Sequence, residues 1–306
     1  MRESADAALI QQRGGASWVG KMNFADRLLE AQRKKNSIAI LGVDPQLDTG
    51  KELGVPAGYT VERFCCEVVE ACAASVIAIK PQLAFFEARG IEGMNAFVAV
   101  TKLARKLGLL TIADAKRGDI GPTSAAYASA FLGDGDFGCD AVTVNPYLGS
   151  DAIMPFLRAV PQGRGIFALV KTSNPTAGEF QDLATAEGPI WECVARRIQG
   201  IGSDFLGECG LSAIGAVVGA TYPDHARRAR QLMPGALILV PGYGAQGATA
   251  VDAVAAARAD GTGVMVSASR SVMYAYRNRA GASPAIAAAE AVEAMRIELN
   301  SVRATG

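Results

Sequence analysis

The sequence predicts an α/β protein with a (β/α)8 barrel, or TIM barrel, fold. Eight short, nearly continuous apolar runs follow one another at a mean spacing of about 32 residues, which is the size of one βα unit. Amphipathic helical patterns lie between these runs. The main alternative is a doubly wound open sheet, which is disfavoured because no G-x-G-x-x-G follows the first run.

The eight apolar runs are rich in β-branched residues and are bounded by turn formers, as strands buried on both faces are. In chain order they are Ser37–Asp44, Ser75–Pro81, Leu109–Ala115, Asp140–Asn145, Gly165–Lys171, Ile214–Ala220, Ala236–Gly242 and Gly263–Ala268. The connection that follows Lys171 is long and rich in turn formers, and a long loop at this end of a barrel is often a lid.

Helical periodicity identifies the segments that would cover the barrel. They are Val61–Ala73, Gly93–Leu107, Thr123–Leu132, Pro189–Ile201, Pro223–Met233, Ala248–Ala257 and Ser283–Asn300. A further short helix over Phe24–Lys34 precedes the first strand and could plug the bottom of the barrel. We expect residues 1–22 to form a poorly ordered extension and residues 23–306 to form a single barrel domain.

The composition excludes several classes of protein. Thirty basic residues balance thirty acidic ones among the 306, which argues against a nucleic-acid binder that works by counterion release. His225 is the only histidine, so zinc sites built from several histidines are excluded. We interpret His225 as part of a surface helix start rather than a catalytic group, because it follows Pro223 and Asp224.

The six cysteines, the apolar runs and the first residues of the chain indicate the cellular compartment of the protein. The cysteines form no C-x-x-C pair and lie in apolar surroundings, which predicts reduced, mostly buried thiols and a cytoplasmic protein. No apolar run approaches eighteen residues, and the first residues carry charges where a signal peptide needs apolar ones. We therefore expect neither a membrane partner nor a nucleic-acid partner.

Charged residues stand at the carboxyl ends of several predicted strands, where barrels carry their chemistry. Asp44 ends the first strand, Lys80 the second, and Asp114 with Lys116 the third. Two residues apart on a strand, Asp114 and Lys116 should point to the same side. A cation beside an anion in a dry pocket suits proton transfer to a developing carbanion. Two other interpretations stay open: an ion-pair network that only closes the barrel mouth, and a Schiff-base lysine.

The last two loops predict a phosphate site. Gly242, Gly244 and Gly247 follow the seventh strand and would let backbone N–H groups approach an anion closely. Arg270 follows the eighth strand and can add a bidentate clamp. Phosphate sites are frequent at these two loops of a barrel.

At Asp114-Ala115-Lys116-Arg117-Gly118-Asp119 the sequence resembles the orotidine 5′-phosphate decarboxylase family, whose barrels carry D-x-K-x-x-D at the end of the third strand. The resemblance covers roughly residues 37–275. The further matches, in the order of the family, are Asp44, Lys80, Lys171-Thr172-Ser173-Asn174-Pro175, the Pro241–Gly247 loop with Gln246, and Ser269-Arg270-Ser271. The KTSNP segment is similar to that of the bacterial subgroup with longer chains.

The resemblance implies a cofactor-free and metal-free decarboxylation of orotidine 5′-phosphate to uridylate (UMP) in pyrimidine biosynthesis. It makes Lys116 the acid that protonates C6 and places Asp114 beside the departing carboxylate. It implies that Lys80 and Asp44 hold the ribose hydroxyls and that Ser173 reads the pyrimidine edge. The remaining implied substrate contacts are Gln246 between ring and phosphate, Arg270 on the phosphate, and Pro241 and Ser269 beside them.

The resemblance also implies a homodimer in which Asp119, with Ile120 and Thr123, reaches the site of the neighbouring subunit. Three rival functions stay open on the sequence. They are a metal-dependent sugar-phosphate decarboxylase or synthase of the same superfamily, a non-catalytic nucleotide-phosphate binding barrel, and a Schiff-base aldolase.

Overall fold

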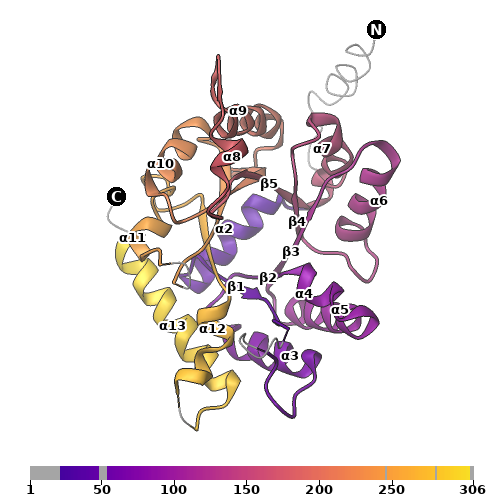
Figure 1. Ribbon diagram of the computed structural model, residues 1–306, viewed down its shortest axis with the longest axis vertical. Coiled ribbons are helices and arrows are strands. Elements are labelled where there is room, and N and C mark those ends of the chain that lie inside the picture. Colours follow the sequence, from indigo (N-terminus) through magenta and orange to yellow (C-terminus); the bar gives the residue numbers. More distant parts are fainter. Residues whose placement is uncertain (1–20, 48–53, 245–246, 280, 304–306) are drawn as a thin grey trace.

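The structure, a computed structural model, describes residues 21–47, 54–244, 247–279 and 281–303. Eight parallel strands close into a barrel, which confirms the predicted (β/α)8 architecture (Figure 1). The barrel strands are β1 (Ala39–Val43), β2 (Ala78–Pro81), β3 (Leu110–Arg117), β4 (Ala141–Val144), β5 (Gly165–Lys171), β8 (Ser212–Val218), β9 (Ala236–Pro241) and β10 (Val264–Ala268). Their order around the barrel is β1-β10-β9-β8-β5-β4-β3-β2. Most of the extension predicted over residues 1–22 lies outside the described residues.

Each barrel strand overlaps one of the predicted apolar runs, and β8 begins and ends two residues earlier than predicted. Nearly every strand residue is buried, because side chains on one face fill the barrel and those on the other pack under the helices. This two-sided burial explains why the runs are continuous in apolar character rather than alternating.

A ring of helices surrounds the strands in Figure 1. Its members are α3 (Val61–Cys72), α5 (Gly90–Lys106), α6 (Gly121–Leu132), α7 (Ser150–Leu157), α9 (Ile190–Gly202), α10 (Pro223–Leu232), α11 (Ala250–Ala253) and α13 (Pro284–Arg303). Shorter elements are α4 (Leu83–Glu87), α8 (Gly178–Gln181), α12 (Arg270–Met273), the two-stranded β6 (Ala184–Thr185) and β7 (Gly188–Pro189), and 3-10 turns at Val160–Gln162, Ser203–Phe205 and Ala275–Asn278. Among these described elements, none is a helix with the length and apolar character needed to cross a bilayer.

Helix α2 (Phe24–Lys35) closes the bottom of the barrel, as predicted. Figure 1 shows it within the outline of the ring of strands. The ring of Phe24 packs edge-on against Phe167 of β5, with centroids 5.9 Å apart. Gln32 Nε2 donates to the carbonyl of Val264 at 3.0 Å, and Arg27 forms an ion pair with Asp140 at 2.7 Å. These contacts join the helix to the amino ends of β4, β5 and β10.

Two of the covering helices, α7 and α11, depart from the prediction, and the short helices α4, α8 and α12 were not predicted. Helix α7 was not predicted because it contains Pro155, which in a sequence indicates a helix break. Helix α11 is shorter than the predicted Ala248–Ala257 segment: Thr249 forms a capping box with Asp252, and the helix ends after Ala253. An alanine-rich apolar segment carries no stop signal of its own, so the sequence overestimates its length.

Candidate active site

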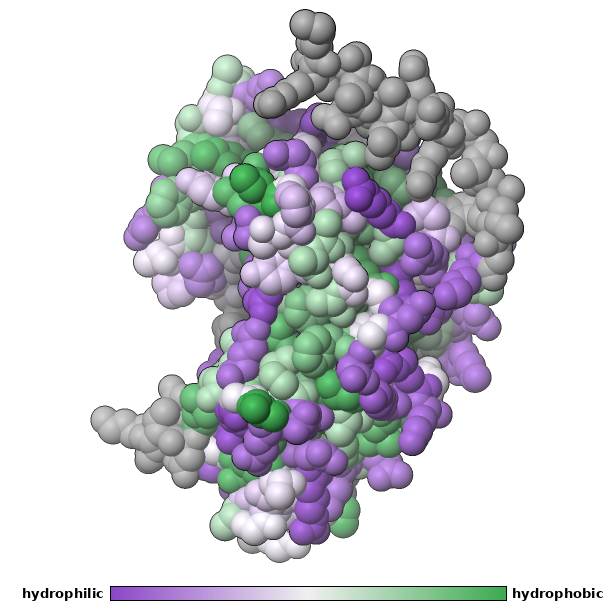
Figure 2. Space-filling model, turned by 90° about the vertical axis from the view of Figure 1, so that its right-hand side faces the viewer, coloured by the Kyte–Doolittle hydropathy of each residue, from purple (hydrophilic) through white to green (hydrophobic). Residues whose placement is uncertain are grey.

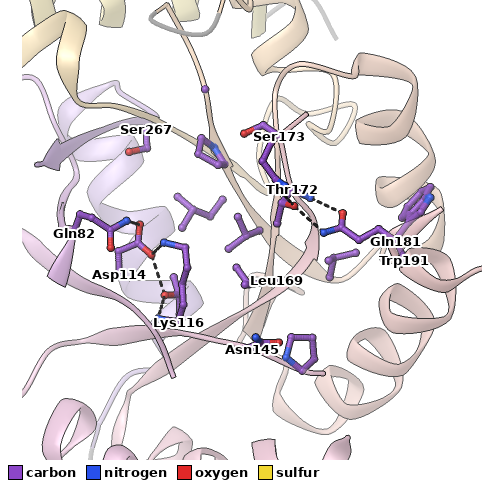
Figure 3. A pocket seen from close by; sticks show the side chains of 18 of the residues that line it. Gln82, Asp114, Lys116, Asn145, Leu169, Thr172, Ser173, Gln181, Trp191 and Ser267 are labelled. Carbon is purple, nitrogen blue, oxygen red and sulfur yellow. Dashed lines mark hydrogen bonds and ion pairs between the residues drawn. The ribbon is translucent and has the colours of Figure 1, made fainter. Parts of the chain in front are cut away.

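A cavity of about 1010 Å³ opens at the carboxyl ends of the barrel strands (Figure 3). The predicted site residues that line it are Asp44, Lys80, Asp114, Lys116, Ser173, Pro241, Ser269 and Arg270. Asp119 and Ile120, which lie between β3 and α6, and Thr123, in the first turn of α6, are not among the described residues that line this cavity. Gln246 lies outside the described residues.

The carboxyl end of β3 has an irregular backbone. Its pairing with β4 shifts register between Ala113 and Arg117. Lys116 adopts a φ of 48°, a left-handed conformation that costs a residue with a side chain roughly 1–2 kcal/mol. Such strain persists only where the surroundings hold it, and it is frequent at functional sites. The side chains of Asp114 and Lys116 reach the same cavity, as predicted.

Asp114 is the centre of the charge network. Lys80 Nζ lies 2.5 Å from its Oδ2, and Lys116 Nζ lies 2.6 Å from its Oδ1. Gln82 Nε2 also donates to Oδ2 at 3.0 Å. Burial alone would raise the pKa of Asp114, but the ammonium groups of Lys80 and Lys116 outweigh it and hold the pKa well below its ordinary value. The carboxylate is therefore ionised at neutral pH.

Asp44 and Lys80 complete the predicted array of two carboxylates and two ammonium groups. Burial lowers the pKa of Lys80, but Asp114 and Asp44 outweigh it and raise this pKa above its usual value, so the ammonium is retained. Burial also raises the pKa of Asp44, against the opposing effects of Lys80 and a hydrogen bond from Ser269. Asp44 Oδ1 is buried and has no hydrogen-bond partner among the described residues, so it can accept a bond from a ligand hydroxyl.

Replacing Asp114 by Asn should lower the free energy of unfolding by about 3–5 kcal/mol at pH 7, because the buried Lys80 ammonium loses its anion. Folding lowers the pKa of Asp114, so the ionised carboxylate stabilises the folded protein. This stabilisation is complete above the pKa that Asp114 has in the unfolded chain, and it is lost as the pH falls through the lower pKa of the folded protein. The difference between variant and wild type should be constant from pH 7 to about 5 and shrink below about pH 4.

Urea unfolding at several pH values measures this difference. The matched control is Asp134→Asn, because Asp134 is an exposed aspartate paired with Arg164 at the surface. The control should leave the unfolding free energy nearly unchanged. A difference for Asp114→Asn that keeps its full size down to pH 2 would contradict the assigned pKa direction.

The segment after β5 folds back onto the end of its strand. Lys171 is buried, and its ammonium forms an ion pair with Asp182 at 2.6 Å rather than reaching the cavity. Gln181 bonds both the backbone N–H of Thr172, at 3.0 Å, and its hydroxyl, at 2.7 Å. Figure 3 shows Gln181 and Thr172 on the side of the cavity opposite Asp114. These bonds fix the loop that carries Ser173.

The glycine-rich loop after β9 was expected to direct backbone N–H groups at a phosphate, and the structure agrees with this only in part. Gly242 and Gly244 have φ values of 103° and 73°, so the turn requires glycine at both positions. The N–H groups of Gly244 and Gly247, however, donate to the carbonyls of Ala248 and Gly244. These two amides close the loop on itself and are not directed at a ligand. Arg270, exposed at the start of α12, lines the cavity beside this loop.

Comparison with known proteins decides the family. A model of the "Orotidine 5'-phosphate decarboxylase / HUMPS family" matches residues 40–285, which is most of the chain. The chain belongs to the orotidine 5′-phosphate decarboxylase / HUMPS family.

Two curated members of the orotidine 5′-phosphate decarboxylase family are similar over most of their length. The protein from Rhodopirellula baltica is 41% identical over 273 residues, covering 84% of this chain and 90% of its own. The protein from Deinococcus radiodurans is 42% identical over 279 residues, covering 90% and 97%. Both are named orotidine 5′-phosphate decarboxylase. The solved OMP decarboxylase of Leishmania donovani has 32% identity and a TM-score of 0.74, covering 92% of this chain and 99% of its own.

Within this decarboxylase-family barrel, the structure adds site residues that the sequence analysis missed. Gln82 follows β2 directly and donates to Asp114, and Thr143 on β4 donates to the same carboxylate at 3.1 Å. Asn145 and Trp191 also line the cavity (Figure 3). The sequence could have identified Gln82 as a site residue, because it directly follows Lys80 and Pro81 at the carboxyl end of a strand, where side chains reach the mouth of the barrel. Thr143 gave no signal, because a threonine in an apolar strand is ordinary β-sheet composition.

Proposed function

We propose that the chain converts orotidine 5′-phosphate to UMP and carbon dioxide, with Lys116 as the proton donor and without a cofactor. The observation that carries the proposal is the Lys116 ammonium, held 2.6 Å from the ionised, buried carboxylate of Asp114 at the carboxyl end of β3. The names of the relatives at 41% and 42% identity support the same reaction.

In the proposed step the bond between C6 and its carboxylate breaks, carbon dioxide leaves, and the electron pair stays on C6. Lys116 Nζ gives a proton to C6 and becomes a neutral amine. Because the ammonium is oriented before the reaction, it stabilises the developing carbanion without reorganisation. The side chain of Lys116 is 44% exposed, so water can return the proton after the product has left.

The other cavity residues would bind the nucleotide. Asp44, whose buried Oδ1 has no partner in the part of the chain that the structure describes, and Lys80 would take the ribose hydroxyls. Ser173, on the loop fixed by Gln181, would meet the pyrimidine edge. Arg270 would bind the phosphate, with Pro241 and Ser269 beside it, and Gln246 would lie between ring and phosphate. Binding energy from the phosphate, remote from C6, can then be used to align the ring.

We further propose a homodimer in which Asp119, Ile120 and Thr123 enter the partner's cavity. Large apolar side chains are exposed in this region. Ile120 itself is 58% exposed, and Tyr147 and Leu148, which precede α7, are 83% and 49% exposed. They precede α6 and α7, the helices on the right of Figure 1, and Figure 2 shows a band of hydrophobic surface on this side of the molecule. Apolar surface of this kind is typical of subunit contacts.

The activity test is the ultraviolet absorbance change of orotidine 5′-phosphate mixed with purified protein in excess EDTA. We expect rapid loss of the orotidylate absorbance, with UMP as the product. The rival that the sequence leaves open, a metal-dependent sugar-phosphate decarboxylase or synthase, would require a divalent cation. No turnover by a folded protein that binds UMP would contradict the proposed reaction, and turnover that EDTA abolishes would contradict its metal independence. Borohydride added with substrate would reveal a Schiff-base lysine.

A further inference from the structure

Thr143 is a buried side chain that touches both members of the Asp114–Lys116 pair. It lies on β4, beside β3, and is 1% exposed. The backbone N–H of Lys116 donates to its Oγ1 at 2.9 Å, and Oγ1 donates its own hydrogen to Asp114 Oδ1 at 3.1 Å. One hydroxyl therefore joins the main chain of the proposed proton donor to the carboxylate that holds its ammonium.

We propose that Thr143 is a positioning residue that holds the Lys116 backbone and the Asp114 carboxylate in their reactive arrangement. This inference rests on the proposed function, because it assigns Thr143 a role in the reaction that Lys116 carries out. Thr143 acts through these two residues and requires no contact with the substrate.

The backbone of β3 shows why Lys116 needs such support. Regular pairing between β3 and β4 is interrupted after Ala113 and resumes at Arg117, whose carbonyl accepts from the N–H of Asn145 at 2.8 Å. Lys116 lies inside this interruption, with a φ of 48°. The threonine hydroxyl thus takes the N–H of Lys116 where the strand pairing is irregular, and it helps to hold a backbone conformation that a lysine rarely adopts.

Each oxygen of the Asp114 carboxylate accepts two hydrogen bonds, and these bonds fix the orientation of the carboxylate. Oδ2 accepts from Lys80 and Gln82, and Oδ1 accepts from Lys116 and Thr143. Without the hydroxyl, the ammonium of Lys116 is the one remaining donor to Oδ1 among the described residues, and its side chain is half exposed and can rotate. The position of that ammonium relative to C6 would then vary, and small displacements of a reacting group have large effects on rate.

Thr111 provides a matched control within the same pair of strands. Its hydroxyl accepts the backbone N–H of Asp140 at 3.1 Å and donates to Asp140 Oδ2 at 2.9 Å, which repeats the bonding pattern of Thr143. Both threonines are buried. Thr111 lies at the bottom of the barrel, where Asp140 pairs with Arg27 of α2, and it does not line the cavity described above.

The experiment compares Thr143→Val, Thr143→Ser and Thr111→Val in the full chain, with steady-state kinetics on orotidine 5′-phosphate. We expect Thr143→Val to lower kcat about 10- to 100-fold with little change in KM, because chemistry and not nucleotide binding is affected. Thr143→Ser keeps the hydroxyl and should stay within about threefold of wild type. Thr111→Val should lose stability and keep its kcat. If Thr143→Val does not fold, Thr143→Ala replaces it.

Hydrogen–deuterium exchange of the Lys116 amide, measured without ligand, tests the same arrangement independently of activity. Faster exchange in Thr143→Val and wild-type exchange in Thr143→Ser, together with the kinetic result, would support the proposal. Unchanged exchange at Lys116, a kcat near wild type in Thr143→Val, or an equal loss of kcat in Thr111→Val would overturn it. A wild-type chain that turns over no orotidine 5′-phosphate would instead contradict the proposed function, and the exchange measurement would still decide whether Thr143 holds Lys116.

Discussion

A Lys116→Ala variant should lose about 10⁴-fold or more of its kcat/KM for orotidine 5′-phosphate. The substitution removes the proton donor, a contribution of about 10²–10⁴ in rate, together with the preoriented cation that stabilises the carbanion. The fold should survive, because the buried Lys80 still neutralises Asp114 and Lys116 itself lies at the cavity surface.

Steady-state kinetics and the melting temperature check this prediction together. Lys102→Ala is the matched control, since Lys102 is an exposed lysine of α5 that also forms an ion pair, with Asp136 at 2.7 Å. The control should keep wild-type kinetics. Near-normal turnover by a folded Lys116→Ala protein would remove Lys116 from the reaction.

Mixing Lys116→Ala subunits with Asp119→Ala subunits should restore about a quarter of the wild-type activity, although each variant alone is inactive. In a symmetric dimer with shared sites, the heterodimer contains one site with both residues intact and one site that lacks both. Random exchange at equal concentrations makes about half of the dimers heterodimers, so about one site in four is repaired.

Two differently tagged variants, mixed and purified through both tags, isolate the heterodimer and allow its activity to be measured directly. Activity of about half the wild-type value per dimer is expected for this pure species. An inactive heterodimer of verified composition would show that Asp119 serves its own subunit. The control mixes Lys116→Ala subunits tagged in both ways, which should remain inactive.

The barrel and the centre of its site could be predicted because a buried strand requires a recognisable sequence pattern, a continuous apolar run. Strand β5 was predicted with the bounds that the structure has, since turn-forming residues flank a continuous apolar run. Asp114 and Lys116 could be found because charged residues at the end of such a run need a partner or a function. Gln82 and Thr143 escaped notice because uncharged polar residues impose no such requirement until their neighbours are known.

Lys171 is an exception to the inference that a charged residue at the carboxyl end of a barrel strand faces the active site. As a charged residue at the end of a strand, it fits the same pattern as Lys80, yet its ammonium turns away from the cavity to Asp182. The sequence could not distinguish the two lysines, because the pairing of β5 with β8 shifts register between Leu169 and Lys171, and the sequence does not show this shift. Local backbone irregularities of this kind decide which face a side chain takes, and they have no simple sequence signature.

Helix α2 has a consequence for how the chain reaches its folded state. It is synthesised first among the described helices, yet its hydrogen-bond partners lie far ahead in the chain: Asn23 bonds Phe205, and Gln32 bonds Val264, separations of 182 and 232 residues. On the ribosome, Phe24 lacks its partner Phe167 until β5 has been synthesised, and Gln32 lacks the carbonyl of Val264 until β10, the last barrel strand, has emerged. Closure of the barrel is therefore a late event that joins the two ends of the chain, and such long-range pairing makes folding slow.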